Sequence, residues 1–299
     1  MITFDGGGVR GVYASELLDR IVTTEPSIIE KTDLFAGTSS GGITALCLAY
    51  GMTPAETVEF YKFYSKYIFS APFWRKVKGV GRLFRARYDN KKLRDVLQSV
   101  FGDTTLAQLR KNVLIPSFNL NAVRDNISVW RPKFFHNFPV PESDGQELVY
   151  DVGVRTSVAP TYFPSHQSYI DGGVVADNPS MAALARVLDK DGGAQKLEDI
   201  RLLSFSTGLN PKYISAPRSD WGIIQWGRHH IIDIAITSGS LGVVDYECSS
   251  LLGDHYYRLR PVLPKSVGLD DVRGIPRLIE YAKQVNLTSA LSWIREQFL

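Results

Sequence analysis

Ser39 is the residue of this chain whose surroundings best suit covalent chemistry. It lies in Gly37-Thr38-Ser39-Ser40-Gly41, which follows the apolar run Leu34-Phe35-Ala36 and leads into the helix-forming stretch Ile43–Tyr50. A strand, a sharp turn and a helix in this order form a nucleophile elbow. The turn is so tight that the positions two before and two after the serine must be glycine. The pattern predicts Ser39 as the nucleophile of an acyl transfer, although a Gly/Ser-rich loop can also produce a five-residue match.

A second glycine stretch, Asp5-Gly6-Gly7-Gly8-Val9-Arg10-Gly11, follows the strand-like residues Met1–Phe4. Three consecutive glycines expose backbone N–H groups, because no side chain blocks the approach of an oxyanion. If the two strands are neighbours, this loop lies beside the elbow. Gly6, Gly8 and Gly11 also match the dinucleotide fingerprint G-x-G-x-x-G, which requires an acidic residue at the end of the second strand. That strand ends at Gly37 and carries Asp33 only near its start, so the pattern favours an oxyanion hole.

Asp171 is the candidate base. A short strand, Ser168–Ile170, delivers it directly before Gly172-Gly173. Active-site loops of open α/β sheets gather at the carboxyl ends of the strands, which is where this aspartate is expected. In isolation, the local sequence favours an ordinary turn aspartate.

The composition narrows the class of protein. The chain has 299 residues, 44% of them hydrophobic, and a net charge of +3, so it can form a large core and carries no overall signal for nucleic-acid binding. Cys47 and Cys248 are the only cysteines, which indicates neither a disulfide framework nor a metal site. The N-terminus does not resemble a signal peptide, and no run of 18 apolar residues follows. We therefore expect a cytoplasmic protein, at most peripheral on membranes, without a cofactor.

Strand and helix patterns alternate through most of the chain, without internal repeats or linkers. A single domain over 1–299 is the economical interpretation, with the motifs in 1–210 and a mainly helical part at 211–299. The predicted strands are 1–4, the run ending at 37, 113–120, 126–130, 168–170, 200–206 and an edge strand at 255–260. The predicted helices follow residue 11 and occupy 43–50, a stretch opened by Thr53-Pro54-Ala55-Glu56, 90–101, 149–158, 180–188 and 280–299.

One stretch is unusually basic and aromatic. Between Arg75 and Arg94 there are nine Lys or Arg residues and a single acid, Asp89. Basic residues interleaved with aromatic ones suit an anionic lipid surface, although a solvated insertion has a similar composition. The candidate membrane-contact residues are Phe73, Trp74, Arg75, Lys76, Arg82, Phe84 and Arg85.

Together these motifs resemble the patatin-like phospholipase family. The resemblance rests on Asp5–Gly11, Gly37–Gly42, Ser157–Pro164, and Asp171-Gly172-Gly173 with Asn178-Pro179 behind it. It implies a three-layer α/β/α sandwich around a mainly parallel sheet, and hydrolysis of phospholipids, lysophospholipids, galactolipids or neutral glycerides without a metal. It also implies particular roles: a catalytic dyad of Ser39 and Asp171, an oxyanion hole at Gly6, Gly7 and Gly8, and the family's basic position at Arg10.

The chemistry leaves alternatives open. A carboxylate with a pKa of about 3.9 is a feeble base near pH 7, so a dyad leans on its oxyanion hole. A Ser-Asp-His triad would instead add His229, His230 or His255 to Ser39 and Asp171. Two further possibilities are a catalytically silent lipid-binding protein, against which the intact motifs count, and an enzyme that requires an activator.

Overall fold

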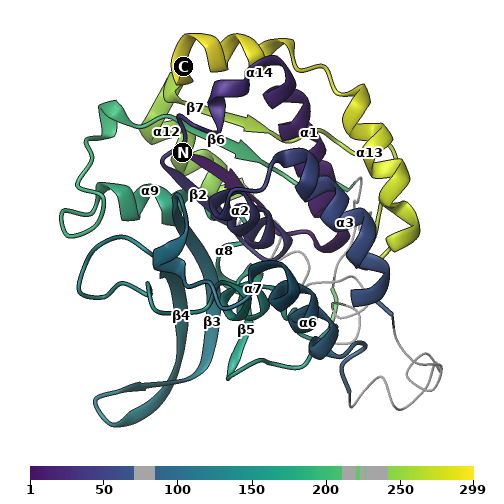
Figure 1. Cartoon of the computed structure of the whole chain (residues 1–299), viewed down its shortest axis with the longest axis vertical. Coiled ribbons are helices and arrows are strands. Elements are labelled where there is room, and N and C mark those ends of the chain that lie inside the picture. The colour runs from purple at the N-terminus through teal and green to yellow at the C-terminus, as the bar shows by residue number, and fades with distance from the viewer. Residues whose placement is uncertain (71–84, 211–219, 223–225, 227–241) are drawn as a thin grey trace.

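The computed structural model describes residues 1–70, 85–210, 220–222, 226 and 242–299, and these form an α/β fold with helices on both faces of one sheet (Figure 1). The sheet has seven strands in the order β4-β3-β2-β1-β6-β7, with β5 also paired to β3. The strands are β1 (Ile2–Phe4), β2 (Leu34–Gly37), β3 (Asn112–Arg124), β4 (Ile127–His136), β5 (Tyr169–Asp171), β6 (Leu202–Phe205) and β7 (Tyr256–Leu259). Five of them are parallel, while β4 and β5 run antiparallel to β3, so the predicted mainly parallel sheet is confirmed.

Alternating side chains of the central strands fill two cores, one on each face of the sheet. Phe35 of β2 faces one core, whereas its neighbours Leu34 and Ala36 face the other. The same alternation separates Leu203 from Leu202 in β6. Successive residues of a strand point to opposite faces, and strands covered on both faces must be apolar throughout. The short apolar runs of this sequence therefore specify a buried sheet.

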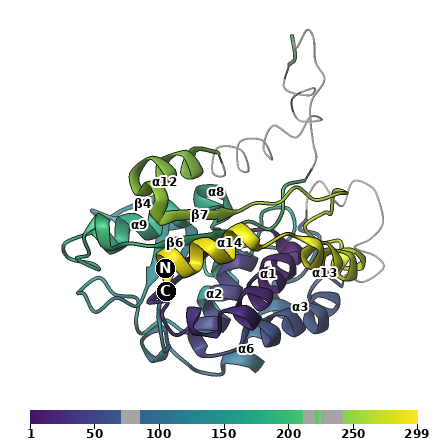
Figure 2. The same ribbon diagram turned by 90° about the horizontal axis from the view of Figure 1, so that it is seen from above.

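The larger core lies under helices from both halves of the chain. They are α1 (Gly11–Thr24), α2 (Ser40–Tyr50), α3 (Pro54–Ile68), α6 (Asn90–Phe101), α7 (Val149–Ser157), α13 (Ile275–Gln284) and α14 (Thr288–Trp293). The smaller core lies under α9 (Ser180–Leu188) and α12 (Val244–Leu252). Figure 2 shows α9 and α12 on one side of the sheet and α1, α3 and α6 on the other. This is the predicted three-layer arrangement.

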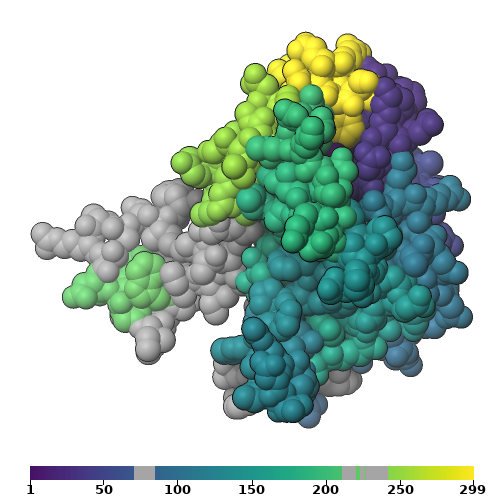
Figure 3. All heavy atoms as spheres, turned by 90° about the vertical axis from the view of Figure 1, so that its left-hand side faces the viewer, coloured from purple at the N-terminus to yellow at the C-terminus, as the bar shows by residue number. Residues whose placement is uncertain are grey.

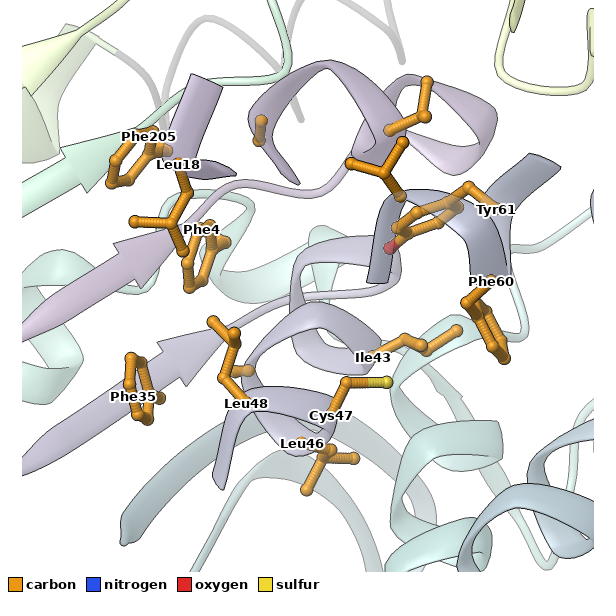
Figure 4. Close-up of a cluster of buried hydrophobic side chains, with 14 of the residues drawn as sticks. Phe4, Leu18, Phe35, Ile43, Leu46, Cys47, Leu48, Phe60, Tyr61 and Phe205 are labelled. Atoms are coloured by element: carbon orange, nitrogen blue, oxygen red, sulfur yellow. The ribbon is translucent and has the colours of Figure 1, made fainter. Parts of the chain in front are cut away.

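The larger core supports the strand ends from which the site is built. Phe4 and Phe205, the last residues of β1 and β6, stack with ring centroids 5.4 Å apart (Figure 4). From the aromatic helix α3, Tyr61 reaches the start of α2, where its hydroxyl donates to the Ser40 carbonyl oxygen at 2.6 Å. The capping box predicted at Thr53 and Glu56 starts this helix. The buried aromatic residues of α3 thus hold α2 against the sheet.

The main departure from the predicted elements is the hairpin of β3 and β4, which is longer than the expected strands at 113–120 and 126–130. The first strand was expected to end at 120 because Asn121 and Asp125 are turn-forming residues. In the structure the strand continues past Asn121 with a register irregularity between Asn119 and Ala122, and the chain turns at Asp125-Asn126, which have φ of 51° and 61°. Positive φ at both residues is typical of a two-residue hairpin turn. No described helix is long and apolar enough to cross a bilayer.

Candidate active site

Ser39 lies at a strained turn between β2 and α2, as predicted. Its φ of 55° and ψ of −124° are unusual for a residue with a side chain, and α2 begins at the next residue. A Cβ atom on Gly37 would collide with the Gly41 carbonyl oxygen, and one on Gly41 would collide with the carbonyl oxygens of Phe4 and Asp5. Both glycines are therefore required for the turn to close.

The glycine loop lies beside this turn because β1 and β2 are parallel neighbours, with Phe4 opposite Gly37. The Thr38 N–H donates to the Phe4 carbonyl oxygen at 3.2 Å, which ties the two strand ends together. On the other side, the Ser39 N–H donates to Thr156 Oγ1 at 3.0 Å, and that hydroxyl donates to the Pro116 carbonyl oxygen at 2.6 Å. The serine backbone is thus held from both neighbouring strands.

Asp171 reaches Ser39 because two strands share one edge of β3. That edge pairs with β2 up to Leu114 and then, from Ser117, with β5, whose last residue is Asp171. Ser39 Oγ donates a hydrogen bond to Asp171 Oδ2 at 2.7 Å, and the Gly173 N–H donates to Oδ1 at 2.7 Å. Both carboxylate oxygens therefore have a fixed partner, and the first partner is the hydroxyl that a base would deprotonate.

The carboxyl group of Asp171 is buried, and this changes its acidity. Burial raises its pKa to about 6, although the Gly173 N–H and the Ser39 hydroxyl favour the charged form. A carboxylate with a pKa near 6 is a better base at neutral pH than an ordinary aspartate, and it remains mostly ionised there. The objection that a carboxylate is too weak a base is therefore smaller in this structure than the sequence suggested.

This burial should make Asp171 costly for stability, so Asp171→Asn is expected to stabilise the folded protein at pH 8. A pKa raised by about 2 units means that the folded state binds the proton more tightly than the unfolded chain. The charged form of Asp171 lowers the free energy of unfolding. This loss is absent below about pH 4, about half of its full size at pH 5, and about 3 kcal/mol above pH 7. An asparagine can accept the Gly173 N–H through its oxygen and donate to Ser39 Oγ through its nitrogen, so neither neighbour loses its partner. Urea unfolding of both proteins at pH 8 and pH 5 measures this, and equal stability at pH 8 would contradict the raised pKa.

The glycine loop provides two backbone donors. Among the described residues, the N–H groups of Gly7 and Gly8 have no hydrogen-bond acceptor, whereas the Gly6 N–H donates to the Asp177 carbonyl oxygen at 3.0 Å. Gly6 therefore shapes the loop, and the expected three-glycine donor set reduces to Gly7 and Gly8. Gly8 has φ of +58°, and a Cβ atom on it would collide with the Leu269 carbonyl oxygen. That carbonyl oxygen accepts the Val9 N–H at 2.8 Å.

Arg10 supports the backbone of the glycine loop. Its guanidinium donates to the carbonyl oxygens of Gly208 at 3.1 Å and Gly7 at 3.4 Å. Because these bonds fix the Gly7 carbonyl group, they also orient the Gly8 N–H, which belongs to the same peptide unit. Arg10, the basic position that the resemblance implied beside the oxyanion hole, thus contacts the loop backbone and positions it.

Asp177 and Arg258 belong to the site, but the sequence analysis did not single them out. Asp177 Oδ1 lies so close to Gly6 that a Cβ atom there would collide with it. Burial raises the pKa of Asp177 well above its usual range, and the nearby Asp5 and Asp171 raise it further. Arg258 of β7 forms a buried bidentate ion pair with Asp5, at 2.6 and 3.1 Å. Asp177 directly precedes the Asn178-Pro179 of the motif, which could have pointed to it, but nothing local could have paired Asp5 with Arg258.

The described histidines do not complete a triad. β7 runs parallel to β6 and begins opposite Leu202, so His255 lies just before it, at the amino ends of the strands and away from Ser39. His255 Nδ1 contacts Arg201, and His166 contacts Asp151 at 2.7 Å. His229 and His230 lie outside the described residues. So do Phe73, Trp74, Arg75, Lys76, Arg82 and Phe84 of the basic aromatic segment, whereas Arg85 is described and exposed.

The sheet, the elbow and the adjacent glycine loop define the class as α/β proteins with a serine at a strand-to-helix turn. Comparison with known proteins refines this class. The model of the patatin-like phospholipase family matches residues 2–184. Protein teg of Priestia megaterium is 31% identical over 100% of this chain and 98% of its own length. The chain belongs to the patatin-like phospholipase family, as the sequence motifs predicted.

Two further relatives are more distant or cover less of the chain. The cGAMP-activated phospholipase of Vibrio cholerae is 34% identical over 73% of this chain and 66% of its own length. Patatin-like protein 2 of Arabidopsis thaliana is 28% identical over 84% of this chain and 71% of its own length. Membership of this family implies lipid acyl hydrolase activity.

Proposed function

We propose that this protein is a serine lipid acyl hydrolase of the phospholipase A or lysophospholipase type, with Ser39 as nucleophile and Asp171 as base. The single observation that carries the proposal is the 2.7 Å hydrogen bond from the Ser39 hydroxyl to a buried carboxylate, at a strained turn beside free backbone N–H groups. Nucleophile, base and oxyanion donors are the parts that acyl transfer requires. The proximity of the glycine loop to the serine supports this assignment, since a Cβ atom on Gly6 would lie 3.4 Å from Ser39 Cβ.

The proposed reaction has two stages. Ser39 Oγ attacks the ester carbonyl carbon while Asp171 takes its proton, and the Gly7 and Gly8 N–H groups stabilise the oxyanion. Asp171 then returns the proton to the leaving alcohol, and an acyl-serine remains. Water, deprotonated by Asp171, then attacks this ester. The bond from the acyl carbon to Ser39 Oγ breaks, Asp171 returns the proton to Oγ, and the fatty acid is released. Arg10 and Arg258 contribute by holding the loop that carries the donors.

The substrate class is a lipid with a carboxylic ester bond. A mixed lipid extract incubated with the protein and analysed by mass spectrometry tests this directly. Free fatty acid and a matching lysolipid or glycerol product are expected with the wild-type protein and not with Ser39→Ala. If the wild-type protein releases fatty acid from none of the lipid classes, the proposal is contradicted. The basic aromatic segment that includes Trp74, Arg75 and Lys76 remains a candidate for contact with the membrane that supplies the substrate.

The proposed base predicts a pH profile. We expect kcat/KM for a short-chain ester to fall below about pH 6, because protonated Asp171 cannot accept the serine proton. A profile without an acidic limb between pH 5 and 7 would contradict the assignment of Asp171.

A further inference from the structure

The hairpin formed by β3 and β4 ends in an exposed apolar tip. Beyond Asn119 the hairpin is a two-stranded ribbon with no further strand beside it in the described part of the chain. Four large apolar side chains on this ribbon are exposed: Leu120 (43%), Val123 (70%), Ile127 (64%) and Trp130 (76%). Figures 1 and 3 show the ribbon projecting from the body of the molecule. Large apolar side chains gathered on a projecting element mark an interaction site.

The ribbon projects from the edge of the sheet that carries the candidate active site. β3 is parallel to β2 and β1, whose carboxyl ends lead into the elbow and the glycine loop. Ser117 of β3 is opposite Asp171, and the strand continues seven residues further to Arg124. At about 3.3 Å per residue, the tip lies roughly 20 Å beyond the proposed base in the strand direction. A surface that the tip touches would therefore face the strand ends that carry the site.

The apolar side chains lie on both faces of the ribbon. Val123 is opposite Ser128, whereas the adjacent pair joins Arg124 and Ile127. Neighbouring pairs point to opposite faces, so Val123 and Ile127 point away from each other. A folded protein partner covers one face of a ribbon and leaves the other in water. A bilayer interface surrounds an inserted ribbon on all sides, so this distribution fits lipid.

The charges on the ribbon fit an anionic lipid surface. Arg124 and Arg131 are exposed, and the single acidic residue between them, Asp125, is at the turn, 3.7 Å from Arg124. A fully exposed ion pair of this kind is weak and does not hold the arginine away from other partners. Long basic side chains beside a tryptophan can reach phosphate groups while the apolar groups enter the acyl region. The ribbon thus combines apolar anchors with an excess of positive charge.

From these observations we propose that the β3–β4 hairpin inserts its tip, Leu120, Val123, Ile127 and Trp130, into anionic lipid bilayers and presents the Ser39 site to the membrane surface. This inference rests on the proposed function for its choice of lipid. The basic aromatic segment is a separate candidate for membrane contact. It consists of other residues, and its role is independent of the hairpin.

Vesicle binding tests the hairpin without relying on catalysis. The proteins carry Ser39→Ala, and the vesicles contain equal parts of phosphatidylcholine and phosphatidylglycerol. The variant Val123→Ser/Ile127→Ser/Trp130→Ser should bind at least tenfold more weakly than its parent. The matched control is Phe63→Ser/Tyr246→Ser/Val262→Ser, which removes side chains of similar exposure (78%, 73% and 64%) from other surfaces and should bind like the parent. Equal binding by the hairpin variant would overturn the proposal.

A labelled variant provides a second measurement if the triple variant is unstable. Both described cysteines are buried, so Ile127→Cys can carry an environment-sensitive dye, with Phe63→Cys as its matched control. The dye at 127 should shift to the blue on these vesicles and be quenched by lipids labelled in the acyl chain, whereas the dye at 63 should not. An unchanged spectrum at 127 would overturn the proposal. The proposal would also be overturned if the hairpin variant lost a dimer that its parent forms but still bound vesicles. Failure of the proposed function would appear separately, as no hydrolysis of a monomeric ester by the wild-type protein.

Discussion

Ser39→Ala and Asp171→Asn are each expected to lower kcat for a short-chain ester by at least ~10³, because removal of a nucleophile or its base typically has an effect of this size. Their side chains are joined by a 2.7 Å hydrogen bond, and no described histidine contacts either of them. The two effects should not add in the double variant, since each change disables the same step. Steady-state kinetics with a chromogenic ester measures all three, and EDTA should have no effect on the wild-type rate.

Histidine variants are the control for this prediction. His255→Ala should retain the wild-type kcat, because the start of β7 places His255 at the far edge of the sheet. His229→Ala and His230→Ala test the two histidines that the structure does not describe. A loss of ~10³ in kcat in either of them would replace the dyad with a Ser-Asp-His triad. Circular dichroism separates such a loss from unfolding.

The second large effect is expected at the glycine loop. Gly8→Ala should lower kcat by ~10²–10³ with little change in KM, because the new methyl group meets the Leu269 carbonyl oxygen and displaces the donors from the oxyanion. Gly7→Ala should act similarly, since its methyl group would collide with Thr207. A change confined to kcat is typical of lost transition-state stabilisation.

The structure provides a matched control for Gly8→Ala. Gly102 has φ of +56°, close to the +58° of Gly8, but a Cβ atom there would meet nothing within 4 Å. Gly102→Ala therefore also places an alanine at positive φ, at a cost of about 1–3 kcal/mol, without a collision near the site. Its kcat should match that of the wild type. If Gly8→Ala loses only as much stability as Gly102→Ala and keeps its kcat, the oxyanion role is wrong. NAD binding detected by calorimetry would then revive the dinucleotide interpretation of the loop.

Local patterns were sufficient to predict the elements that carry the motifs. The glycines of the elbow and of the first loop have steric requirements that are visible in the sequence, and the apolar runs specified a sheet covered on both faces. A motif reflects the requirements of its own backbone and gives no information on a partner far away in the sequence. It could therefore not reveal the ion pair of Asp5 with Arg258, 253 residues apart, or the contact of Gly8 with Leu269. The raised pKa of Asp171 was also beyond prediction, because burial is a property of the assembled fold.

The same long-range contacts make the order of synthesis important. Ser39 and Asp171 are both present when α9 has emerged from the ribosome, but the glycine loop still lacks Arg258, which pairs with Asp5, and Leu269, which accepts the Val9 N–H. A nascent chain at that stage has its nucleophile and base but not the supports of its oxyanion donors. The glycine loop thus gains its last support only when Leu269 has been made, so a chain that stops before this residue is expected to lack a correctly held pair of backbone donors beside Ser39.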